Sequence, residues 1–439
     1  MKKIFYIFTS ILLTILPLIS YNCYAASFNC PVKTTCESIL LVNLDSDVTI
    51  YEKNSHTRRS PASTTKIMTY IIVSEQIDDL EGTTVTITKD IINELSGTGS
   101  SVAGLKEGDN ISIYNLLQCL MISSGNDAAL ALAKYVGNGN INSFVEMMNN
   151  KAIELGCLDT HFVNPHGLYE PEHYTTSSDL YKITKYAMSL PYFSEIVNTV
   201  VAYPFGENRY PIVTTNSLID KVRGGEYYYR YAKGIKTGHL DESGYCLVSS
   251  ATKNGHTYIC VALGAPSIDK NGDQITLNGA MKDSKELYVW AFDSFTIKKI
   301  LDSNTPVTEV KIRYSWDTDT LLLVPSSNFS TILPKNVEAS SVEITPSIPE
   351  FVNATVKEGD KIGTATLRYA NQDLATIDLV ASKTVNRNIT LYIISMIKNI
   401  ITSKWFIISM VIVLILTILY IMLTTLYNKK LKASKYKYK

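Results

Sequence analysis

The chain has 439 residues, 46% of them hydrophobic and 19% charged, which excludes a disordered polypeptide. Its 41 basic and 41 acidic residues balance. Eight of the lysines lie in two acid-free end segments, so the rest carries 33 basic and 41 acidic residues, and this net negative charge argues against nucleic acid as a partner.

The first 25 residues have the layout of a secretory signal peptide. Lys2 and Lys3 precede an apolar stretch from Ile4 to about Ile19, and small residues follow at Ala25 and Ala26. We expect cleavage after Ala25, with an uncleaved anchor as the alternative. The mature chain would keep six cysteines, too few for a disulfide scaffold in a chain of this length. The spacing of Cys30 and Cys36 permits a bridge without requiring one.

The next segments predict strands and then a helix. Residues 38–52, SILLVNLDSDVTIYE, read as two strands around a polar turn at residues 45–47. A helix is predicted to open at Pro61, a residue suited to a first helical turn. Its apolar residues recur at the three-and-four spacing of a helix face: Ile67, Met68, Ile71 and Ile72.

The middle of the chain predicts helices and then a hairpin. A helical zone from Tyr114 to Leu155 is interrupted by a corner at residues 123–126, which read SSGN. Alternation begins at Tyr228, and Asn-Gly at 254–255 between two alternating runs is the strongest short hairpin signal. A last helix is predicted over about Lys282 to Phe295.

The C-terminal part predicts a β-domain and a membrane anchor. Residues 305–382 contain short strands and turns, which we interpret as a small β-sandwich. Residues 391–403 form a candidate amphipathic helix on the bilayer surface. Trp405–Tyr427 has 23 residues without a charge, enough to cross a bilayer as a helix. Six lysines follow, so this tail is predicted to be cytoplasmic and everything before the anchor to face outward.

The stretch SPASTTKIMTY, from Ser60 to Tyr70, places a serine and a lysine three residues apart at the start of the first predicted helix. A serine hydroxyl needs a base within hydrogen-bonding reach to act as a nucleophile. The spacing puts Ser63 and Lys66 on one helix face, and unpaired amides at the helix start suit an oxyanion. Lysine can serve as the base when burial and a nearby cation lower its pKa.

Two further motifs distinguish this serine from four chance Ser-x-x-Lys repeats elsewhere in the chain. Ser-Gly-Asn at 124–126 begins 61 residues beyond Ser63, and Lys-Thr-Gly at 236–238 begins 112 residues further on. Three such elements in this order form the active-site set of the penicillin-recognising serine enzymes.

The chain resembles the low-molecular-mass penicillin-binding proteins of the serine-type D-alanyl-D-alanine carboxypeptidase family over nearly all of its outer segment. The matching stretches are PASTTKIMT (61–69), SGNDAALALA (124–133), THFVNPHGL (160–168), HYTTSSDL (173–180), KTGHLDESGYCLV (236–248) and VKEGDKIGTATL (356–367). The resemblance implies an α+β fold, with a β-lactamase/transpeptidase-like catalytic domain whose antiparallel sheet is flanked by helices, then a small all-β sandwich and a C-terminal transmembrane helix. No cofactor or metal is implied.

The resemblance also implies catalytic roles. Ser63 would attack the carbonyl between two terminal D-alanines of a peptidoglycan stem peptide, and Lys66 would accept its proton. Ser124, linked to Lys66 and Lys236, would pass a proton to the departing D-alanine. A β-lactam antibiotic would imitate this substrate and leave Ser63 acylated for much longer.

The remaining implied site residues bind substrate. Asn126 would hold the peptide amide, while Lys236 and Thr237, followed by Gly238, would bind the terminal carboxylate. The backbone amides of the nucleophile and of His239 would form the oxyanion hole.

The sequence departs from the family at one point that matters for the site. Relatives commonly carry a carboxylate-binding arginine before the last helix of the catalytic domain, where this chain has residues 278–281, NGAM. Lys270 or Lys282 would have to replace that arginine, or the site binds substrate weakly.

Other interpretations of single motifs are less well supported. Glu-Pro-Glu at 170–172 is similar to the deacylating loop of class A β-lactamases, but it lies inside a matched carboxypeptidase stretch. Zinc ligands at Cys157, His161, His166 and His173 would lack the spacing of two tight pairs. A calcium loop starting at Asp269 would have its glycine misplaced.

The sequence therefore predicts a membrane-tethered carboxypeptidase, inhibited by β-lactams, that trims peptidoglycan stem peptides. A catalytically weak peptidoglycan- or penicillin-binding envelope protein and a transpeptidase are the alternatives. The expected segments are a signal peptide (1–25), a catalytic domain (26–304), a β-sandwich (305–383), a juxtamembrane segment (384–404), a transmembrane helix (405–427) and a basic cytoplasmic tail (428–439).

Overall fold

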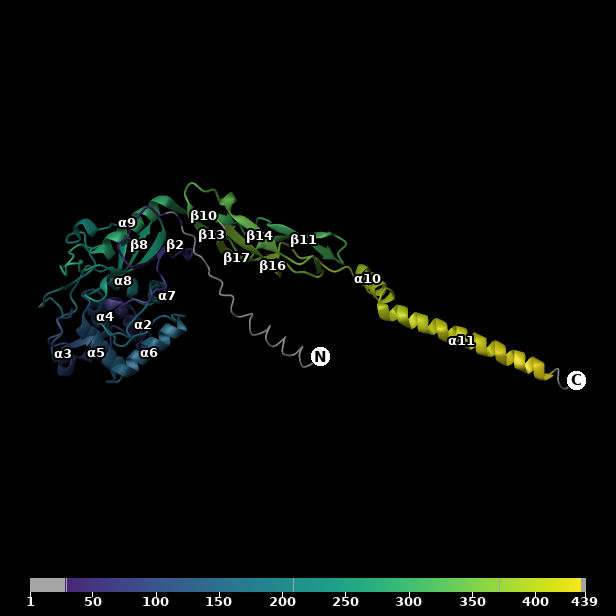
Figure 1. Cartoon of the computed structure of the whole chain (residues 1–439), viewed down its shortest axis with the longest axis horizontal. Helices are drawn as coiled ribbons and strands as arrows, with labels where there is room; N and C mark the ends of the chain where they lie inside the picture. Colours follow the sequence, from purple (N-terminus) through teal and green to yellow (C-terminus); the bar gives the residue numbers. More distant parts are fainter. Residues whose placement is uncertain (1–27, 29, 208, 371, 436–439) are drawn as a thin grey trace. The chain divides into compact units, whose positions relative to one another are not determined.

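The computed structural model describes residues 28, 30–207, 209–370 and 372–435 (Figure 1). The expected signal peptide and the last four residues of the expected tail lie outside the described residues. The chain divides into two compact units, the first up to Lys298 together with Ser330–Glu338, and the second over Lys299–Phe329 and from Ala339 onward. All six cysteines from Cys30 on are free thiols, so no bridge joins Cys30 to Cys36.

The first unit is built on a five-stranded antiparallel sheet. The strand order is β2-β1-β9-β8-β7, with β1 at Ser38–Asn43, β2 at Val48–Lys53, β7 at Ala232–Leu240, β8 at Gly244–Lys253 and β9 at His256–Ala265. The two predicted turns are confirmed. One joins β1 to β2, and the other joins β8 to β9 through Asn254 and Gly255, which both have positive φ, as a tight hairpin turn of this kind requires.

Both faces of this sheet are buried, which explains why residues 39–42 of β1 and 259–263 of β9 are apolar without alternation. Leu40 and Val42 belong to the core that the helices α2 to α8 cover. Ile39 and Leu41, which point to the opposite face, belong to a second core under α9 (Gly279–Ser294). The last predicted helix is thus confirmed, beginning three residues earlier than expected.

The helices of the first core are short and closely packed. They are α2 (Lys66–Gln76), α3 (Lys89–Glu94), α4 (Ile113–Met121), α5 (Asn126–Val136), α6 (Ile141–Glu154), α7 (Ser177–Ala187) and α8 (Phe193–Val197). Figure 1 shows α2, α4, α5 and α6 gathered on one side of the unit. The predicted helical zone contains a second break at residues 137–140, where Gly137 and Gly139 end α5.

Short strands and turns complete the first unit. Two small two-stranded sheets pair β3 (Thr84–Thr86) with β4 (Asn110–Ser112) and β5 (Val201–Ala202) with β6 (Ile212–Val213). Two 3₁₀ turns occur at Ala62–Thr65 (η2) and Gly225–Tyr227 (η3).

The C-terminal region is β-structure followed by two helices. A six-stranded sheet has the order β14-β16-β17-β12-β11-β15, formed by Glu343–Ser347, Lys361–Tyr369, Gln372–Ala381, Thr320–Pro325, Thr308–Arg313 and Phe351–Asn353. A two-stranded sheet pairs β10 (Phe295–Leu301) with β13 (Phe329–Pro334), and a 3₁₀ turn, η4, lies at Ala339–Ser341. The helices are α10 (Ile389–Ile401) and α11 (Lys404–Lys435), and the span Lys404–Lys430 is long and apolar enough to cross a membrane.

Candidate active site

The predicted nucleophile, Ser63, lies in the 3₁₀ turn η2 that leads directly into α2. The serine and the lysine are neighbours, as predicted, because Lys66 Nζ lies 2.9 Å from Ser63 Oγ. The turn is unusual because Ala62 has a φ of 47°, a left-handed value that a residue with a Cβ adopts at a cost. Contacts around Ala62 must therefore hold this backbone in place.

Lys66 is fully buried, because α2 is the central helix of the first unit and every residue from Lys66 to Val73 is buried. Its Nζ lies 2.6 Å from Asn126 Oδ1 and 2.8 Å from the carbonyl oxygen of His166. Burial, and then the nearby charge of Lys236, hold the pKa of Lys66 well below its usual value.

The three neighbours of Lys66 Nζ define how a neutral lysine must be oriented. A neutral amine has two N–H donors and one lone pair. Asn126 Oδ1 and the His166 carbonyl can only accept, so they take the two N–H groups. The lone pair is then left for the hydroxyl proton of Ser63, the geometry that a general base needs.

The second motif forms the corner between α4 and α5, as predicted. Ser124, 5% exposed, has a φ of 63°, and Asn126 is the first residue of α5. Within the described structure no hydrogen bond joins the Ser124 hydroxyl to Lys66 or Lys236. Ser124 and Lys66 therefore share the site without a direct link.

Asp127 fixes the segment that forms the wall of the pocket next to this corner. Its carboxylate accepts hydrogen bonds from the backbone amides of Ala103, Gly104 and Leu105, at 2.8, 3.0 and 3.0 Å. The Asn126 amide in turn donates to the carbonyl of Ser101 at 2.8 Å. These bonds hold residues 98–105 beside the start of α5.

The third motif lies on β7, the edge strand next to η2. Lys236 is buried, donates to the carbonyl of Thr237 at 3.0 Å, and has its pKa lowered by burial to about 7. A Cβ on Gly238 would lie only 3.0 Å from Ala62 Cβ and 3.1 Å from the Ser63 amide nitrogen, so glycine permits the close approach of β7 to the nucleophile turn. His239 is exposed and stacks on Tyr245, with ring centroids 4.5 Å apart.

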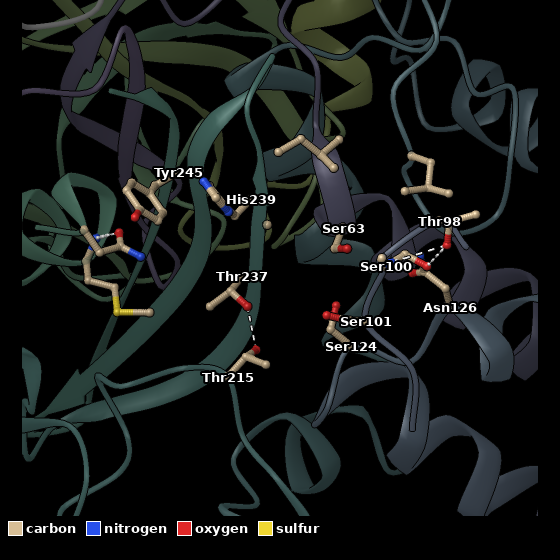
Figure 2. A pocket seen from close by; sticks show the side chains of 16 residues that line it. Ser63, Thr98, Ser100, Ser101, Ser124, Asn126, Thr215, Thr237, His239 and Tyr245 are labelled. Atoms are coloured by element: carbon tan, nitrogen blue, oxygen red, sulfur yellow. Dashed lines mark hydrogen bonds between the residues drawn. The ribbon is translucent and has the colours of Figure 1, made fainter. Parts of the chain in front are cut away.

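The three motifs meet at one cavity of about 410 Å³. Its lining comprises Ser63, Thr98, Gly99, Ser100, Ser101, Ser124, Asn126, Leu168, Thr215, Thr237, Gly238, His239, Leu240, Tyr245, Asn278 and Met281. In Figure 2, Thr237, Thr215, His239 and Tyr245 lie on the left, and Ser63, Ser124 and Asn126 lie to their right. Lys66 and Lys236 are buried behind this surface and so act through their contacts with lining residues.

Thr215 is a site residue that sequence reasoning missed. It follows β6 and places its Oγ1 2.5 Å from Thr237 Oγ1, so two hydroxyl groups face the cavity as a pair. Thr215 belongs to none of the three motifs, and only the pairing of distant segments brings it to β7.

The residues suggested as substitutes for the missing arginine, or as an alternative catalytic base, lie outside the lining of this cavity. Lys270 and Lys282 are exposed and are not among the residues that line the cavity, whereas Asn278 and Thr215 line it. The Glu-Pro-Glu segment at 170–172 lines a different cavity, beside Arg58. It therefore does not supply a base to the Ser63 cavity.

The sequence profile of the D-alanyl-D-alanine carboxypeptidase family matches residues 25–267, and that of the C-terminal domain of penicillin-binding protein 5 matches residues 295–387. More than half of the chain is thus covered by the first family alone. The chain therefore belongs to the D-alanyl-D-alanine carboxypeptidases of the penicillin-binding protein class, which are serine-type peptidases.

Three relatives illustrate the extent of the likeness. The D-alanyl-D-alanine carboxypeptidase DacF of Bacillus subtilis is 28% identical over 355 residues, covering 80% of this chain and 86% of the relative. The crystal structure of penicillin-binding protein 5 from Haemophilus influenzae has a TM-score of 0.66 and 27% identity, covering 82% of this chain and 99% of that one. The Streptomyces K15 DD-transpeptidase has a TM-score of 0.54 and 31% identity, covering 60% and 98%. These neighbours confirm the predicted α+β fold class.

Proposed function

We propose that Ser63 is the nucleophile of a D-alanyl-D-alanine carboxypeptidase reaction and Lys66 its general base. The observation that carries this proposal is the environment of Lys66 Nζ. The amine is buried and its pKa is lowered, and its neighbours are Ser63 Oγ and two groups that can only accept hydrogen bonds. The lowered pKa favours the neutral form of Lys66, and the two acceptors leave its lone pair for the serine hydroxyl.

In the acylation step, Ser63 Oγ attacks the carbonyl carbon of the penultimate D-alanine, and its proton moves to Lys66 Nζ. The negative oxygen of the tetrahedral intermediate is stabilised by the amides of Ser63 and His239, residues that both line the cavity. The C–N bond then breaks, and the leaving D-alanine nitrogen takes up the proton that Lys66 received. Ser124, which lines the same cavity, is the proposed relay, and it would have to move within hydrogen-bonding reach of Lys66 to act as one. Water later hydrolyses the ester and restores the Ser63 hydroxyl.

Substrate binding is assigned to the other residues of the cavity. Asn126 receives an N–H from Lys66 on its Oδ1, which leaves its Nδ2 for the carbonyl of the stem peptide. The terminal carboxylate would lie against Thr237 with the charge of Lys236 behind it, and Gly238 allows β7 to approach the nucleophile turn. An anionic ligand would raise the pKa of Lys236 from about 7 and so favour its charged form.

We further propose that the enzyme is anchored in a membrane with its catalytic unit outside the cell. The apolar span within α11 provides the anchor, and the lysines after it favour a cytoplasmic C-terminus. The expected signal peptide at residues 1–25 would direct export. Peptidoglycan stem peptides and β-lactams are the proposed ligands, and residues 26–304 and 305–383 the proposed catalytic and β-sandwich domains.

The test is release of D-alanine from a pentapeptide ending in D-Ala-D-Ala by the detergent-solubilised chain beside its Ser63→Ala variant. Release by the wild type alone supports hydrolysis through Ser63. Adding an amine acceptor distinguishes transfer: release that depends on the amine would favour a transpeptidase, as the likeness to the K15 enzyme allows. No release under either condition from folded protein would contradict the proposal and favour a binding role.

A further inference from the structure

A buried histidine outside the three motifs lies behind the nucleophile turn. His173 is 2% exposed, and both of its ring nitrogens have hydrogen-bond partners. Its Nδ1 lies 3.0 Å from the backbone nitrogen of Val163, and its Nε2 lies 2.8 Å from Thr65 Oγ1. Thr65 Oγ1 in turn lies 2.8 Å from the carbonyl oxygen of Ala62. The chain of contacts thus ends at the residue immediately before Ser63.

The direction of each of these hydrogen bonds follows from its two ends. The Val163 amide can only donate, so His173 Nδ1 must accept and carry no proton. The Ala62 carbonyl can only accept, so the single proton of the Thr65 hydroxyl points to it. Thr65 must then accept from His173, whose Nε2 carries the proton. One neutral tautomer satisfies all three bonds at once.

Burial, and then the charges of His161 and Lys66, lower the pKa of His173 to about 3. This lowered pKa favours the neutral imidazole that the three hydrogen bonds also require.

The last hydrogen bond of this series, to the Ala62 carbonyl, matters because Ala62 and Ser63 share one peptide group. In a trans peptide the C=O and N–H point in opposite directions, so holding the Ala62 oxygen also aims the Ser63 N–H. Ala62 has a φ of 47°, which a residue with a Cβ does not keep without external contacts. The Ser63 nitrogen lies next to Gly238 of β7, at the cavity.

We propose that His173 is a positioning residue for acyl transfer, holding the Ala62–Ser63 peptide through Thr65 so that the Ser63 N–H faces the oxyanion. The inference rests on the proposed function, in which Ser63 is acylated. It assigns to His173 and Thr65 an effect on the rate of acylation and not on the affinity for the β-lactam.

The test compares two substitutions of His173 that each keep one of its two bonds. In His173→Gln the side-chain amide reaches the position of Nε2 and can still donate to Thr65. In His173→Asn the side-chain oxygen reaches the position of Nδ1 and accepts from Val163, but nothing reaches Thr65. Acylation by a fluorescent penicillin is followed for each full-length protein in detergent, and mass spectrometry identifies Ser63 as the labelled residue.

We expect His173→Asn to lower the acylation rate constant about tenfold, the effect of one lost buried hydrogen bond, and His173→Gln to stay within about threefold of wild type. His161→Asn is the matched control, because His161 lies on the neighbouring bridge to Tyr174 but is part-exposed and makes no contact with Thr65. It is expected to acylate like the wild type. Equal rates for the Asn and Gln variants of His173 would overturn the inference.

Two substitutions of Thr65 keep the inference testable if a His173 variant does not fold. Thr65→Val keeps the shape and loses both hydrogen bonds, whereas Thr65→Ser keeps the hydroxyl. The Val variant should acylate about tenfold more slowly than the Ser variant, and equal rates would contradict the inference. A wild type that no penicillin acylates at Ser63 would instead contradict the proposed function itself.

Discussion

Gly167 packs against the nucleophile turn beside Thr65, and its replacement by alanine is a sharp test of how tightly that turn must be held. A Cβ on Gly167 would lie 1.9 Å from the Ala62 carbonyl oxygen and 2.8 Å from Thr65 Oγ1. Since real Cβ contacts stay above 3.0 Å, the loop and the turn must separate by at least 3.0 − 1.9 = 1.1 Å. A displacement of about 1 Å at a reacting group can cost about a hundredfold in rate.

Two effects on stability accompany this displacement. Gly167 has a φ of 89°, so any side chain there costs about 1 kcal/mol of backbone strain. Overpacking against Ala62 adds about 1–3 kcal/mol. We therefore expect Gly167→Ala to lower the free energy of unfolding by about 2–4 kcal/mol and the rate of acylation by penicillin about a hundredfold.

The matched control is Gly139→Ala. Gly139 has a φ of 85°, but a Cβ there would meet no atom within 4 Å, so this variant carries the backbone strain alone. Urea unfolding and stopped-flow acylation by a fluorescent penicillin measure the two quantities in both variants. If Gly167→Ala acylated as fast as Gly139→Ala, the argument that the turn is held by close packing would be refuted.

Three further predictions concern the walls of the cavity. Burial lowers the pKa of Lys236 from 10.5 to about 7, so between these pH values the unfolded chain binds more protons than the folded one. The free energy of unfolding should therefore rise with pH above about 7. In urea titrations Lys236→Met should lose this rise. Thr215→Val should raise KM about tenfold with little change in kcat, because it removes a hydroxyl that orients Thr237 before and during the reaction. A changed kcat with constant KM would speak against this role. Asp127→Asn should lower the free energy of unfolding by about 2 kcal/mol, because an amide group would face backbone N–H donors such as that of Leu105; unchanged urea midpoints would contradict this.

The sequence predicted those parts of the site that depend on local spacing. Ser63 and Lys66 meet because residues three apart on one turn share a face, and the turn between β8 and β9 follows from the backbone freedom of Asn-Gly. The order of the three motifs identified the family, and the matched profiles bear this out.

The second break in the helical zone was missed although residues 137–140, GNGN, are themselves a turn signal in the sequence. Thr215 was missed because its partner, Thr237, is 22 residues away and on another element. The pairing of Thr215 with Thr237 leaves no periodic signal in the sequence. Lys270 and Lys282, suggested as substitutes for the arginine, are not among the residues that line the cavity.

By itself, then, the sequence indicated the reaction class, the proposed nucleophile and base, and a candidate membrane span, because each depends on residue type and on spacing along the chain. Tertiary structure alone decided the lowering of the Lys66 pKa and the tautomer of His173. Both depend on which groups from distant segments exclude water and offer donors or acceptors, and burial and hydrogen bonding of that kind exist only once the chain has packed.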